Sequence, residues 1–405
     1  MKILHVSTLD WGGAANAGIR LHMGLLKKGV DSKLLVMRQQ NPEIPQSFEF
    51  YTDTYGSGLK AKTIDVMERA HNKRNQLKLK NRKTNFQPFN FSRQFCDITN
   101  NQHYKEADLI NFHWVARFLD YSSFFRKNKK PIVWTLHDME PFGGGNHYEK
   151  EFLFNSYNDL IEDQLKLKKR AVSNQNINVV GPSRWLMNCS KNSEVLGKFP
   201  HYNIPYGLDV DIFRKYDPAE AKAAFGIPAD KKAILFVSEV ITNRRKGFHL
   251  LLEALEILKR DDFYLCAVGK VEEGHALHDI PNFHHLGVIK DQQKMAMAYA
   301  AADVFVIPSI EDNLPNTVLE SICTGTPVIG YDIGGVPDMI QHEQNGLICN
   351  DVSGACLADA MDEFLSLGDK FDRDWIIEDA HNRYHEDLQA RRYHELYESV
   401  LSVRE

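Results

Sequence analysis

Residues 303–337 read DVFVIPSIEDNLPNTVLESICTGTPVIGYDIGGVP, and this stretch decides the fold. An apolar run of strand length leads into a polar loop and then into a helix that carries Glu320. A second apolar run, residues 327–330, is followed by a glycine pair at residues 334–335. A parallel α/β sheet presents a ligand in this order, at the carboxyl ends of its strands. The sequence therefore predicts a binding site in this stretch.

Two acidic residues of the stretch, Asp312 in the loop and Glu320 in the helix, lie eight residues apart. Carboxylates accept hydrogen bonds from vicinal hydroxyls, which suits a sugar and a ribose. The backbone amides of Asn313, Leu314 and the residues entering the helix lie at a positive dipole end, where a phosphate is favoured. An isolated pair of this kind is usually a solvated loop acid and a surface glutamate. The surrounding sequence favours a site instead.

The segment PSIEDNLPNTVLESICTGTPVI resembles the donor-site signature PSxxEGFGxxxxEAxAxGxPVI of the family 4 retaining glycosyltransferases. Asp312 stands at the first glutamate of that signature, Asn313-Leu314-Pro315 replaces its Gly-Phe-Gly, and Glu320 matches outright. The resemblance implies the GT-B fold, an α/β fold of two Rossmann-like, doubly wound domains with a cleft between them. It also implies a catalytic role for Asp312, and donor binding by Asn313, Leu314 and Glu320.

Length, charge and cysteine usage predict a two-domain protein of the cytoplasm. A chain of 405 residues exceeds the size at which a single core usually divides. The six cysteines are scattered without paired spacing, which indicates a reducing compartment, and no apolar run approaches the length of a membrane span. The net charge of −5 divides into +11 for residues 1–208 and −16 for the remainder. A basic first half suggests an anionic acceptor or surface, with drift in surface composition as an equal alternative.

The segment IPYGLDVDIF, residues 204–213, resembles the interdomain connection IPNGVDTxxF of the same family. We therefore expect residues 1–208 to form an acceptor-binding domain and residues 209–386 to form the nucleotide-sugar-binding domain. By resemblance, a helix at residues 387–405 returns to the first domain. Tyr206 takes the place of the family's usual asparagine.

In the first half, a strand at residues 2–8 leads through Gly12 and Gly13 into an amphipathic helix. A glycine pair after a strand is more often just a tight turn. In the resembled family the pair lies against the donor diphosphate and the acceptor, which assigns Gly13 to the donor and Gly12 to the acceptor side. The alternation of strands and helices predicts a doubly wound parallel sheet, with further strands at residues 32–37, 108–113, 131–136 and 177–180.

The segment WTLHDMEPFGGGNHYEK, residues 134–150, places His137 and Asp138 at the carboxyl end of a predicted strand. It resembles the HDMW-F-TGGCHY loop in a branch of the same family, whose histidine faces the transferred sugar. The resemblance assigns that catalytic role to His137 and places Asp138 on the acceptor side. His147 either assists the acceptor or is a satisfied loop histidine, and we favour the latter. In the matching GPSRWL segment, Arg184 is expected near the acceptor.

In the second half, Arg244, Arg245 and Lys246 precede a glycine and a helix. Exposed basic loops are common, but these cations suit the charge of a diphosphate. The resembled family pairs this lysine with an earlier arginine, whose position holds Glu239 here. We assign Lys246 to the leaving diphosphate and Arg244 or Arg245 to the missing guanidinium. By the same resemblance, Val288 in a G-x-V turn lies beside the nucleotide base.

Residues 60–83 carry nine basic residues against two acidic ones, with apolar side chains among them. Our first interpretation is a solvated helix face. The alternative is a cationic amphipathic segment that binds anionic lipid near a lipid-linked acceptor. That alternative would make the protein peripheral at the inner face of the membrane.

The resemblance implies a retaining glycosyltransferase that moves a sugar from a nucleotide-sugar donor to a hydroxyl of a glycan or lipid-linked acceptor, in surface polysaccharide or glycoconjugate assembly. We expect no cofactor, no metal ion and no nucleic acid partner. No DxD stands in a suitable strand-end loop, and His381 and His385 have i, i+4 spacing but no third ligand. Two alternatives use the same scaffold: a sugar-nucleotide epimerase or hydrolase, and a non-catalytic partner subunit that binds a nucleotide sugar. The altered residues Glu239 and Asp312 favour the subunit over the epimerase.

Overall fold

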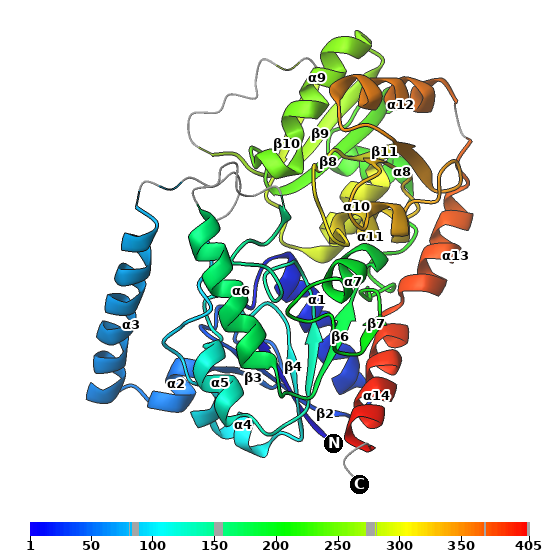
Figure 1. Cartoon of the computed structure of the whole chain (residues 1–405). Helices are drawn as coiled ribbons and strands as arrows, with labels where there is room; N and C mark the ends of the chain where they lie inside the picture. The colour runs from blue at the N-terminus through cyan, green and yellow to red at the C-terminus, as the bar shows by residue number, and fades with distance from the viewer. Residues whose placement is uncertain are drawn as a thin grey trace. The chain divides into compact units, whose positions relative to one another are not determined.

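The computed structural model describes residues 1–80, 82, 89–149, 157–272, 280, 282–367 and 370–402. Backbone contacts divide the chain into two compact units (Figure 1). Unit 1 comprises Met1–Gly207 and Asp387–Glu405, and unit 2 comprises Leu208–Glu386. The chain therefore passes between the units twice, and unit 1 is made of two separate segments.

Unit 1 is built on a seven-stranded parallel sheet with the strand order β3-β2-β1-β4-β5-β6-β7. The inner strands are almost entirely buried, as expected for a parallel sheet that is covered on both faces. The sequence predicts all strands except the two at the edges, which have three residues each and are too short for a pattern. The strands are β1 (Lys2–Ser7), β2 (Asp31–Val36), β3 (Ser47–Glu49), β4 (Leu109–Phe112), β5 (Ile132–Thr135), β6 (Ile177–Gly181) and β7 (His201–Asn203).

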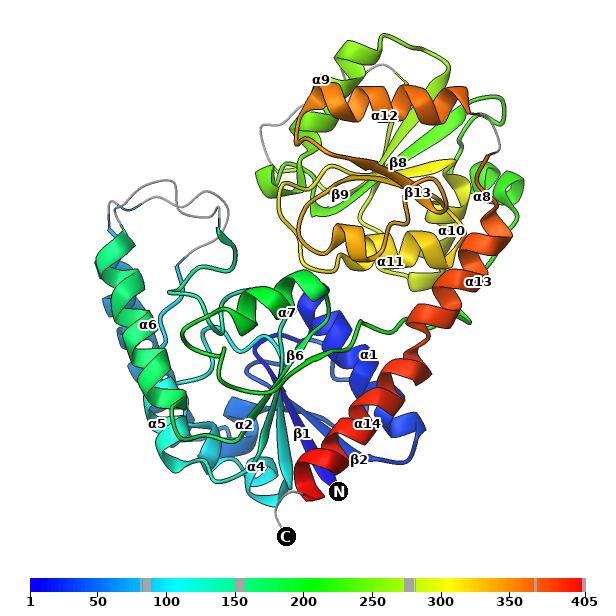
Figure 2. The same ribbon diagram turned by 45° about the vertical axis from the view of Figure 1, so that its right-hand side comes forward.

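Helices cover both faces of this sheet (Figure 2). On one face, Leu21 of α1 and Tyr393 of α14 belong to the same buried cluster. On the other face, Phe124 of α5 and Leu186 of α7 pack in a larger cluster with Trp134. The helices of unit 1 are α1 (Gly13–Lys27), α2 (Phe50–Tyr55), α3 (Leu59–Lys78), η1 (Ile98–Asn100), α4 (Gln102–Glu106), α5 (Tyr121–Lys127), α6 (Asn158–Val172), α7 (Arg184–Lys191) and α14 (Glu386–Ser402).

Unit 2 is built on a six-stranded parallel sheet with the order β10-β9-β8-β11-β12-β13. Its strands are β8 (Lys232–Val240), β9 (Phe263–Lys270), β10 (Phe283–Gly287), β11 (Val304–Ile307), β12 (Val328–Tyr331) and β13 (Gly346–Cys349). In Figure 2, α9 and α12 lie on one side of these strands and α10 and α11 on the other. The helices are α8 (Pro218–Ala224), η4 (Arg244–Lys246), α9 (Phe248–Leu258), α10 (Gln292–Ala301), α11 (Asn316–Cys323), η5 (Val336–Asp338), α12 (Gly354–Ser366) and α13 (Arg373–Tyr384).

Both sheets reverse their winding direction at one point, between β1 and β4 in unit 1 and between β8 and β11 in unit 2. Parallel pairing places the carboxyl ends of such neighbours at the same edge of the sheet. In open α/β sheets, ligands bind outside the carboxyl ends of the strands at this switch point. Ligand-binding residues are therefore expected in the loops after β1 and β4, and in the loops after β8 and β11. The doubly wound α/β fold expected from the sequence is confirmed for both units.

Within the part of the chain that the structure describes, no helix is both long enough and apolar enough to cross a membrane. Helix α3 leaves Val66, Met67 and Leu77 exposed, and Arg38 pairs with Asp65 and Glu68 on it. The lipid contact of residues 60–83 stays a prediction, and residues 81 and 83 of that segment lie outside the described residues.

Candidate active site

The basic turn of unit 2 begins just after β8, at the switch point of the sheet. The side chain of Asn243 accepts a hydrogen bond from the backbone amide of Arg245 at 3.0 Å and starts η4. Gly247 ends the turn with φ +74°, and a Cβ there would lie 1.7 Å from the carbonyl oxygen of Pro308. Only glycine fits this position, because other residues would collide with the backbone. The turn can therefore lie directly against the loop that follows β11.

Three predicted site residues meet where these two loops touch. Lys246 Nζ donates to Asp312 Oδ2 at 2.6 Å, and Arg245 Nη1 lies 3.7 Å from Asp312 Oδ1. Arg245 is buried and also donates to the backbone oxygen of Glu311 at 2.7 Å. Arg244 is exposed. Of the two candidate arginines, Arg245 is therefore the one that lies beside Asp312, and Glu239 is exposed at the end of β8.

Asp312 is held in place by backbone amides at its carboxylate and at its carbonyl oxygen. The amide of Asn313 donates to Asp312 Oδ1 at 3.1 Å, and the amide of Gly335 donates to the Asp312 backbone oxygen at 3.1 Å. Gly334 has φ +54°, and a Cβ there would lie 1.9 Å from that same backbone oxygen. The glycine pair after β12 thus packs against the loop that carries Asp312, so three neighbouring strands, β8, β11 and β12, contribute to one small cluster.

Burial and the neighbouring charges shift the pKa values of Lys246 and Asp312 in opposite directions. Desolvation lowers the pKa of Lys246, and the charge of Asp312 only partly offsets it. Desolvation would raise the pKa of Asp312, but Lys246 and Arg245 hold that pKa below its usual value. Lys246 and Asp312 therefore form an ion pair inside unit 2, in which the lysine already has an internal carboxylate as its partner.

The remaining predicted residues of unit 2 differ in their burial and in their partners. Glu320, on α11, accepts a hydrogen bond from the hydroxyl of Tyr299 on α10 at 3.2 Å. Asn313 and Leu314 are buried. Val288 directly follows β10 and is 61% exposed, so its side chain is accessible to a planar ligand.

The histidine pair near the chain end does not form a helical metal site. Nε2 of His381 donates to the backbone oxygens of Phe213 and Cys323, each at 3.0 Å. Helix α13 ends at Tyr384, so His385 lies outside it. His381 is partly buried and is tied to two neighbouring segments by these hydrogen bonds. Among the described residues, no group of three His, Cys, Asp or Glu side chains could hold a metal ion.

In unit 1, the glycine turn and the predicted arginine lie at helix starts. Gly12, with φ +87°, directly precedes α1, and Gly13 is its first residue. Asp10, in the loop after β1, accepts hydrogen bonds from the amides of Gln40 and Asn41, both at 2.7 Å. This contact fixes the loop that leads into α1. Arg184 is exposed as the first residue of α7, where the side chain of Ser183 caps the helix.

His137 is buried and is part of a chain of histidines. Its Nε2 lies 3.1 Å from Nδ1 of His113, and its Nδ1 lies 2.7 Å from the hydroxyl of Tyr206. Nε2 of His113 in turn lies 2.9 Å from Nδ1 of His5. The sequence does not predict this line of histidines, although it offers one signal, since His113 and His137 both follow strands that are neighbours in the sheet.

Asp138 is buried and is satisfied within unit 1. It accepts hydrogen bonds from Nδ1 of His147 at 2.7 Å, from Nε1 of Trp114 at 2.9 Å and from the amide of Glu140 at 2.9 Å. Burial alone would raise the pKa of Asp138, but His147 and these hydrogen bonds hold it below its usual value. His147 is buried against this carboxylate, as expected for a satisfied histidine. Asp138 therefore anchors the loop that follows β5.

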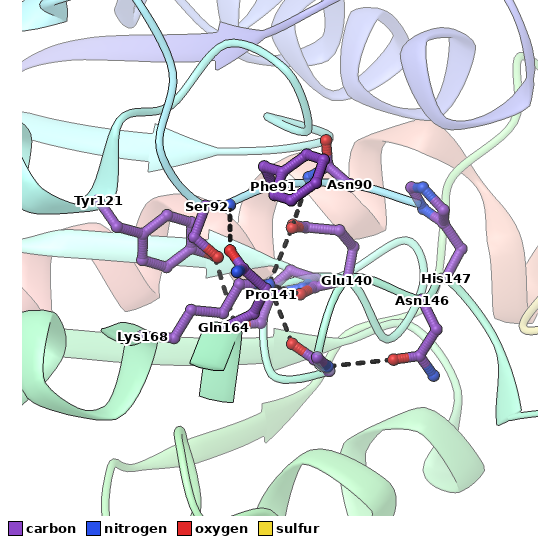
Figure 3. Close-up of polar contacts among 12 residues, drawn as sticks. Asn90, Phe91, Ser92, Tyr121, Glu140, Pro141, Asn146, His147, Gln164 and Lys168 are labelled. Atoms are coloured by element: carbon purple, nitrogen blue, oxygen red, sulfur yellow. Dashed lines mark hydrogen bonds and ion pairs between the residues drawn. The ribbon is translucent and has the colours of Figure 1, made fainter. Parts of the chain in front are cut away.

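The same loop holds a buried ion pair that the sequence does not reveal (Figure 3). Lys168 of α6 has no exposed surface, and its Nζ donates to Glu140 Oε1 at 2.8 Å and to the backbone oxygen of Gly143 at 3.1 Å. It also donates to the backbone oxygen of Glu140, and Asn90 donates to Glu140 Oε1 at 2.7 Å. The loop that contains Gly143 and Gly144 packs closely against α6, since a Cβ on Gly144 would lie 2.4 Å from the side chain of Ile161 on that helix. The pair thus fixes the loop on α6.

Acid should destabilise unit 1 through its buried neutral histidines. Burial lowers the pKa of His5, His22, His113 and His137, the last to about 4. Because the unfolded chain binds protons near pH 6.5 and the folded chain does not, stability is full above about pH 6.5 and falls on acidification. Each histidine contributes a slope of up to about 1.4 kcal/mol per pH unit, so four contribute roughly 5 kcal/mol per unit.

Urea unfolding followed by tryptophan fluorescence measures this effect, because Trp11, Trp114, Trp134 and Trp185 all belong to unit 1. The expected result is a midpoint that is constant above about pH 7 and moves steeply to lower urea between about pH 6.5 and pH 5. A constant midpoint across that acid range would contradict neutral, buried histidines.

Comparison with known families finds a match within unit 2. Residues 231–366, which lie within that unit, match the family model described as Glycosyl transferases group 1. The chain is 29% identical over 172 residues to a D-inositol 3-phosphate glycosyltransferase of Mycobacteroides abscessus, covering 39% of this chain and 38% of the relative. It is 27% identical over 264 residues to the putative teichuronic acid biosynthesis glycosyltransferase TuaC of Bacillus subtilis, covering 64% and 60%. The match thus spans less than two thirds of the length of either relative.

Solved structures share the fold along the whole chain. Sucrose-phosphate synthase from Thermosynechococcus elongatus superposes with a TM-score of 0.68 at 16% identity and covers 100% of both chains. HepE of Anabaena in complex with UDP-glucose superposes with a TM-score of 0.66 at 16% identity, covering 98% of this chain and 100% of that one. Together with the two doubly wound sheets, these likenesses show the GT-B fold.

Proposed function

Because residues 231–366 match the family model described as Glycosyl transferases group 1, we propose that this chain transfers a glycosyl group from a nucleotide sugar to an acceptor hydroxyl. The observation that carries the proposal is the cluster of Arg245, Lys246 and Asp312 at the switch point of unit 2. Two cations suit a diphosphate, and a carboxylate suits sugar hydroxyls. The likeness to HepE, which was solved with UDP-glucose, supports a nucleotide sugar as the donor.

The proposed reaction keeps the anomeric configuration. The bond between the anomeric carbon and the diphosphate oxygen breaks while the bond to the acceptor oxygen forms on the same face. The leaving phosphate oxygen takes the acceptor's proton. Lys246 and Arg245 offset the negative charge that develops on the leaving group, which is stabilisation by preorganised charge. No metal ion is needed in this scheme, because side chains supply the positive charge.

Donor binding in this proposal exchanges one anion for another. Before the donor arrives, Lys246 pairs with Asp312 at 2.6 Å. The diphosphate then takes over Lys246, and Asp312 turns its oxygens to the hydroxyls of the sugar. Glu320 accepts hydrogen bonds from the donor beside Tyr299, Asn313 and Leu314 form the wall of the site, and Val288 lies against the base.

Unit 1 is proposed to bind the acceptor. Gly12, Asp138 and Arg184 belong to the acceptor side, Gly13 to the donor diphosphate and His137 to the transferred sugar. A glycan or lipid-linked acceptor in surface polysaccharide assembly is proposed from the likeness to TuaC. Contact of residues 60–83 with an anionic membrane surface is part of the same proposal.

The direct test incubates the purified full chain with UDP-, GDP- and ADP-sugars and measures nucleotide release with and without candidate acceptors. Release that depends on the acceptor supports transfer. Release that is equally fast without acceptor would indicate a hydrolase instead. Calorimetric binding of a nucleotide sugar without any turnover would favour a non-catalytic subunit.

Replacing Glu320 with alanine is expected to weaken the donor interaction by about 1.5–3 kcal/mol, roughly 10- to 100-fold in kcat/KM, because a hydrogen bond to a charged group is lost. The matched control is Glu343→Ala, which removes an exposed carboxylate of the same unit. Steady-state kinetics with the best donor of the panel decide the outcome. Equal kcat/KM in Glu320→Ala and in the control would remove Glu320 from the site.

A further inference from the structure

The three buried imidazoles of unit 1 form a continuous line that ends at a tyrosine. His5, His113, His137 and Tyr206 are linked by contacts of 2.9, 3.1 and 2.7 Å. The rings of His137 and Tyr206 stack with 22° between their planes. All four side chains are at most 7% exposed. We name this line the histidine relay.

Proton counting allows the relay only two arrangements. A contact between two nitrogens needs one proton, and a neutral imidazole supplies one N–H. The three rings must therefore all carry the proton on Nδ1 or all carry it on Nε2, because any mixture leaves one contact with two protons or with none. The tautomer of each ring is thus coupled to that of the others.

The two arrangements differ at the far end of the relay. Nε2 of His5 is buried and has no hydrogen-bond partner among the described residues. If all rings were in the Nε2–H form, this atom would be a buried donor without an acceptor, which costs about 1–3 kcal/mol. In the Nδ1–H form it is an unused lone pair, and orphaned donors are the rarer defect in folded proteins. The environment of His5 therefore favours the Nδ1–H form.

We propose that Tyr206 is a positioning residue whose hydroxyl oxygen accepts the Nδ1–H of His137, so that the Nδ1–H form favoured at His5 leaves no donor of the relay unpaired. His137 then has Nε2 occupied by His113 and Nδ1 occupied by Tyr206. Its ring is fixed in orientation and is not available as a proton acceptor. This deepens the proposed transfer reaction, in which the leaving phosphate and not His137 takes the acceptor's proton.

His22 stands beside the relay without belonging to it. Its Nε2 donates to the backbone oxygen of Pro45 at 2.8 Å, so its Nδ1 accepts from the hydroxyl of Ser32 at 2.7 Å. A carbonyl can only accept, which fixes His22 in the Nε2–H form. His22 therefore provides an internal reference of the opposite tautomer within the same unit.

The test is a long-range nitrogen–proton NMR spectrum of the full chain with labelled histidine, assigned by single substitutions. In the wild type we expect His5, His113 and His137 in the Nδ1–H form and His22 in the Nε2–H form. Tyr206→Phe keeps the stacked ring but removes the acceptor, so each arrangement then leaves one buried donor unpaired, and all three relay histidines should together populate both the Nδ1–H and the Nε2–H forms. Tyr202→Phe removes a hydroxyl that contacts Asn178 on β6 and should leave all four tautomers unchanged.

Relay histidines in the Nε2–H form in the wild type would overturn the proposal, and that measurement needs no variant to fold. A Tyr206→Phe change confined to His137 would overturn the coupling. The kinetic arm rests on the proposed function: Tyr206→Phe should lower kcat roughly 10-fold while KM for the donor stays within about twofold, because positioning rather than binding is lost. A wild type without turnover would refute the transfer reaction but leave the tautomer result standing.

Discussion

Replacing Lys246 with alanine is expected to lower the rate of sugar transfer by roughly 10²- to 10³-fold, which corresponds to about 2.7–4 kcal/mol. The reason is that Lys246 is proposed to offset the charge on the leaving diphosphate, and this charge is greatest in the transition state. The effect should therefore appear mainly in kcat. Steady-state kinetics with the best nucleotide sugar measure it, and thermal unfolding checks that the variant is folded.

Two further variants separate the charge of Lys246 from its packing. Lys246→Arg keeps the cation beside Asp312 and should recover part of the rate. Lys231→Ala removes another lysine of unit 2, which lies near the amino end of β8 and donates to the backbone oxygen of Asp261, and should transfer sugar at the wild-type rate. A folded Lys246→Ala variant with wild-type kcat would remove Lys246 from the reaction.

Replacing Lys168 with methionine is expected to lower the free energy of unfolding of unit 1 by about 3–5 kcal/mol. The substitution keeps the length of the side chain but leaves the buried carboxylate of Glu140 without its cation, and breaking a buried pair on one side has this cost. Glu140 is 2% exposed, so water cannot replace the lysine without opening the loop. Urea unfolding followed by tryptophan fluorescence measures the change.

The adjacent lysine provides the matched control. Lys169 lies on the same helix, is 60% exposed and pairs with Glu194 on the surface, so Lys169→Met should change stability by at most about 1 kcal/mol. The double variant Lys168→Met with Glu140→Gln removes the orphaned charge and should recover part of the loss. Equal stability of the two lysine variants would contradict a structural role for the buried pair.

The fold and the loop that carries Asp312 could be predicted because their signals are local. The apolar runs at β8 and β11 have strand length, and the polar loop with Asp312 follows β11 directly. The fit between Gly247 and Pro308 could not be predicted, because it joins two loops that only the sheet brings together. For the same reason, the sequence does not show which of Arg244 and Arg245 lies beside Asp312. Only the structure shows that Arg245 is buried and Arg244 is exposed.

The histidine relay and the Lys168 pair escape prediction for another physical reason. His5 lies in the middle of β1, where a sequence pattern reports burial but not the identity of the neighbouring ring. Lys168 lies in a helix rich in polar residues, where the sequence predicts a solvated cation. In the structure it is on the buried face of α6 and pairs with Glu140. Buried polar groups are specified by partners that are distant in sequence, 28 residues away in the case of Lys168.

The last helix sets the order in which the protein can be completed during synthesis. Asn111 and Thr135 of the first sheet bond to Tyr397 and Tyr393 of α14, at 2.7 and 2.9 Å. The ribosome therefore makes the first sheet early, but the face that α1 and α14 share stays only partly covered until α14 emerges. Domains usually finish folding in the order of their synthesis. Here all residues of unit 2 are synthesised before the last segment of unit 1. Unit 1 is therefore begun first, but its core is completed last.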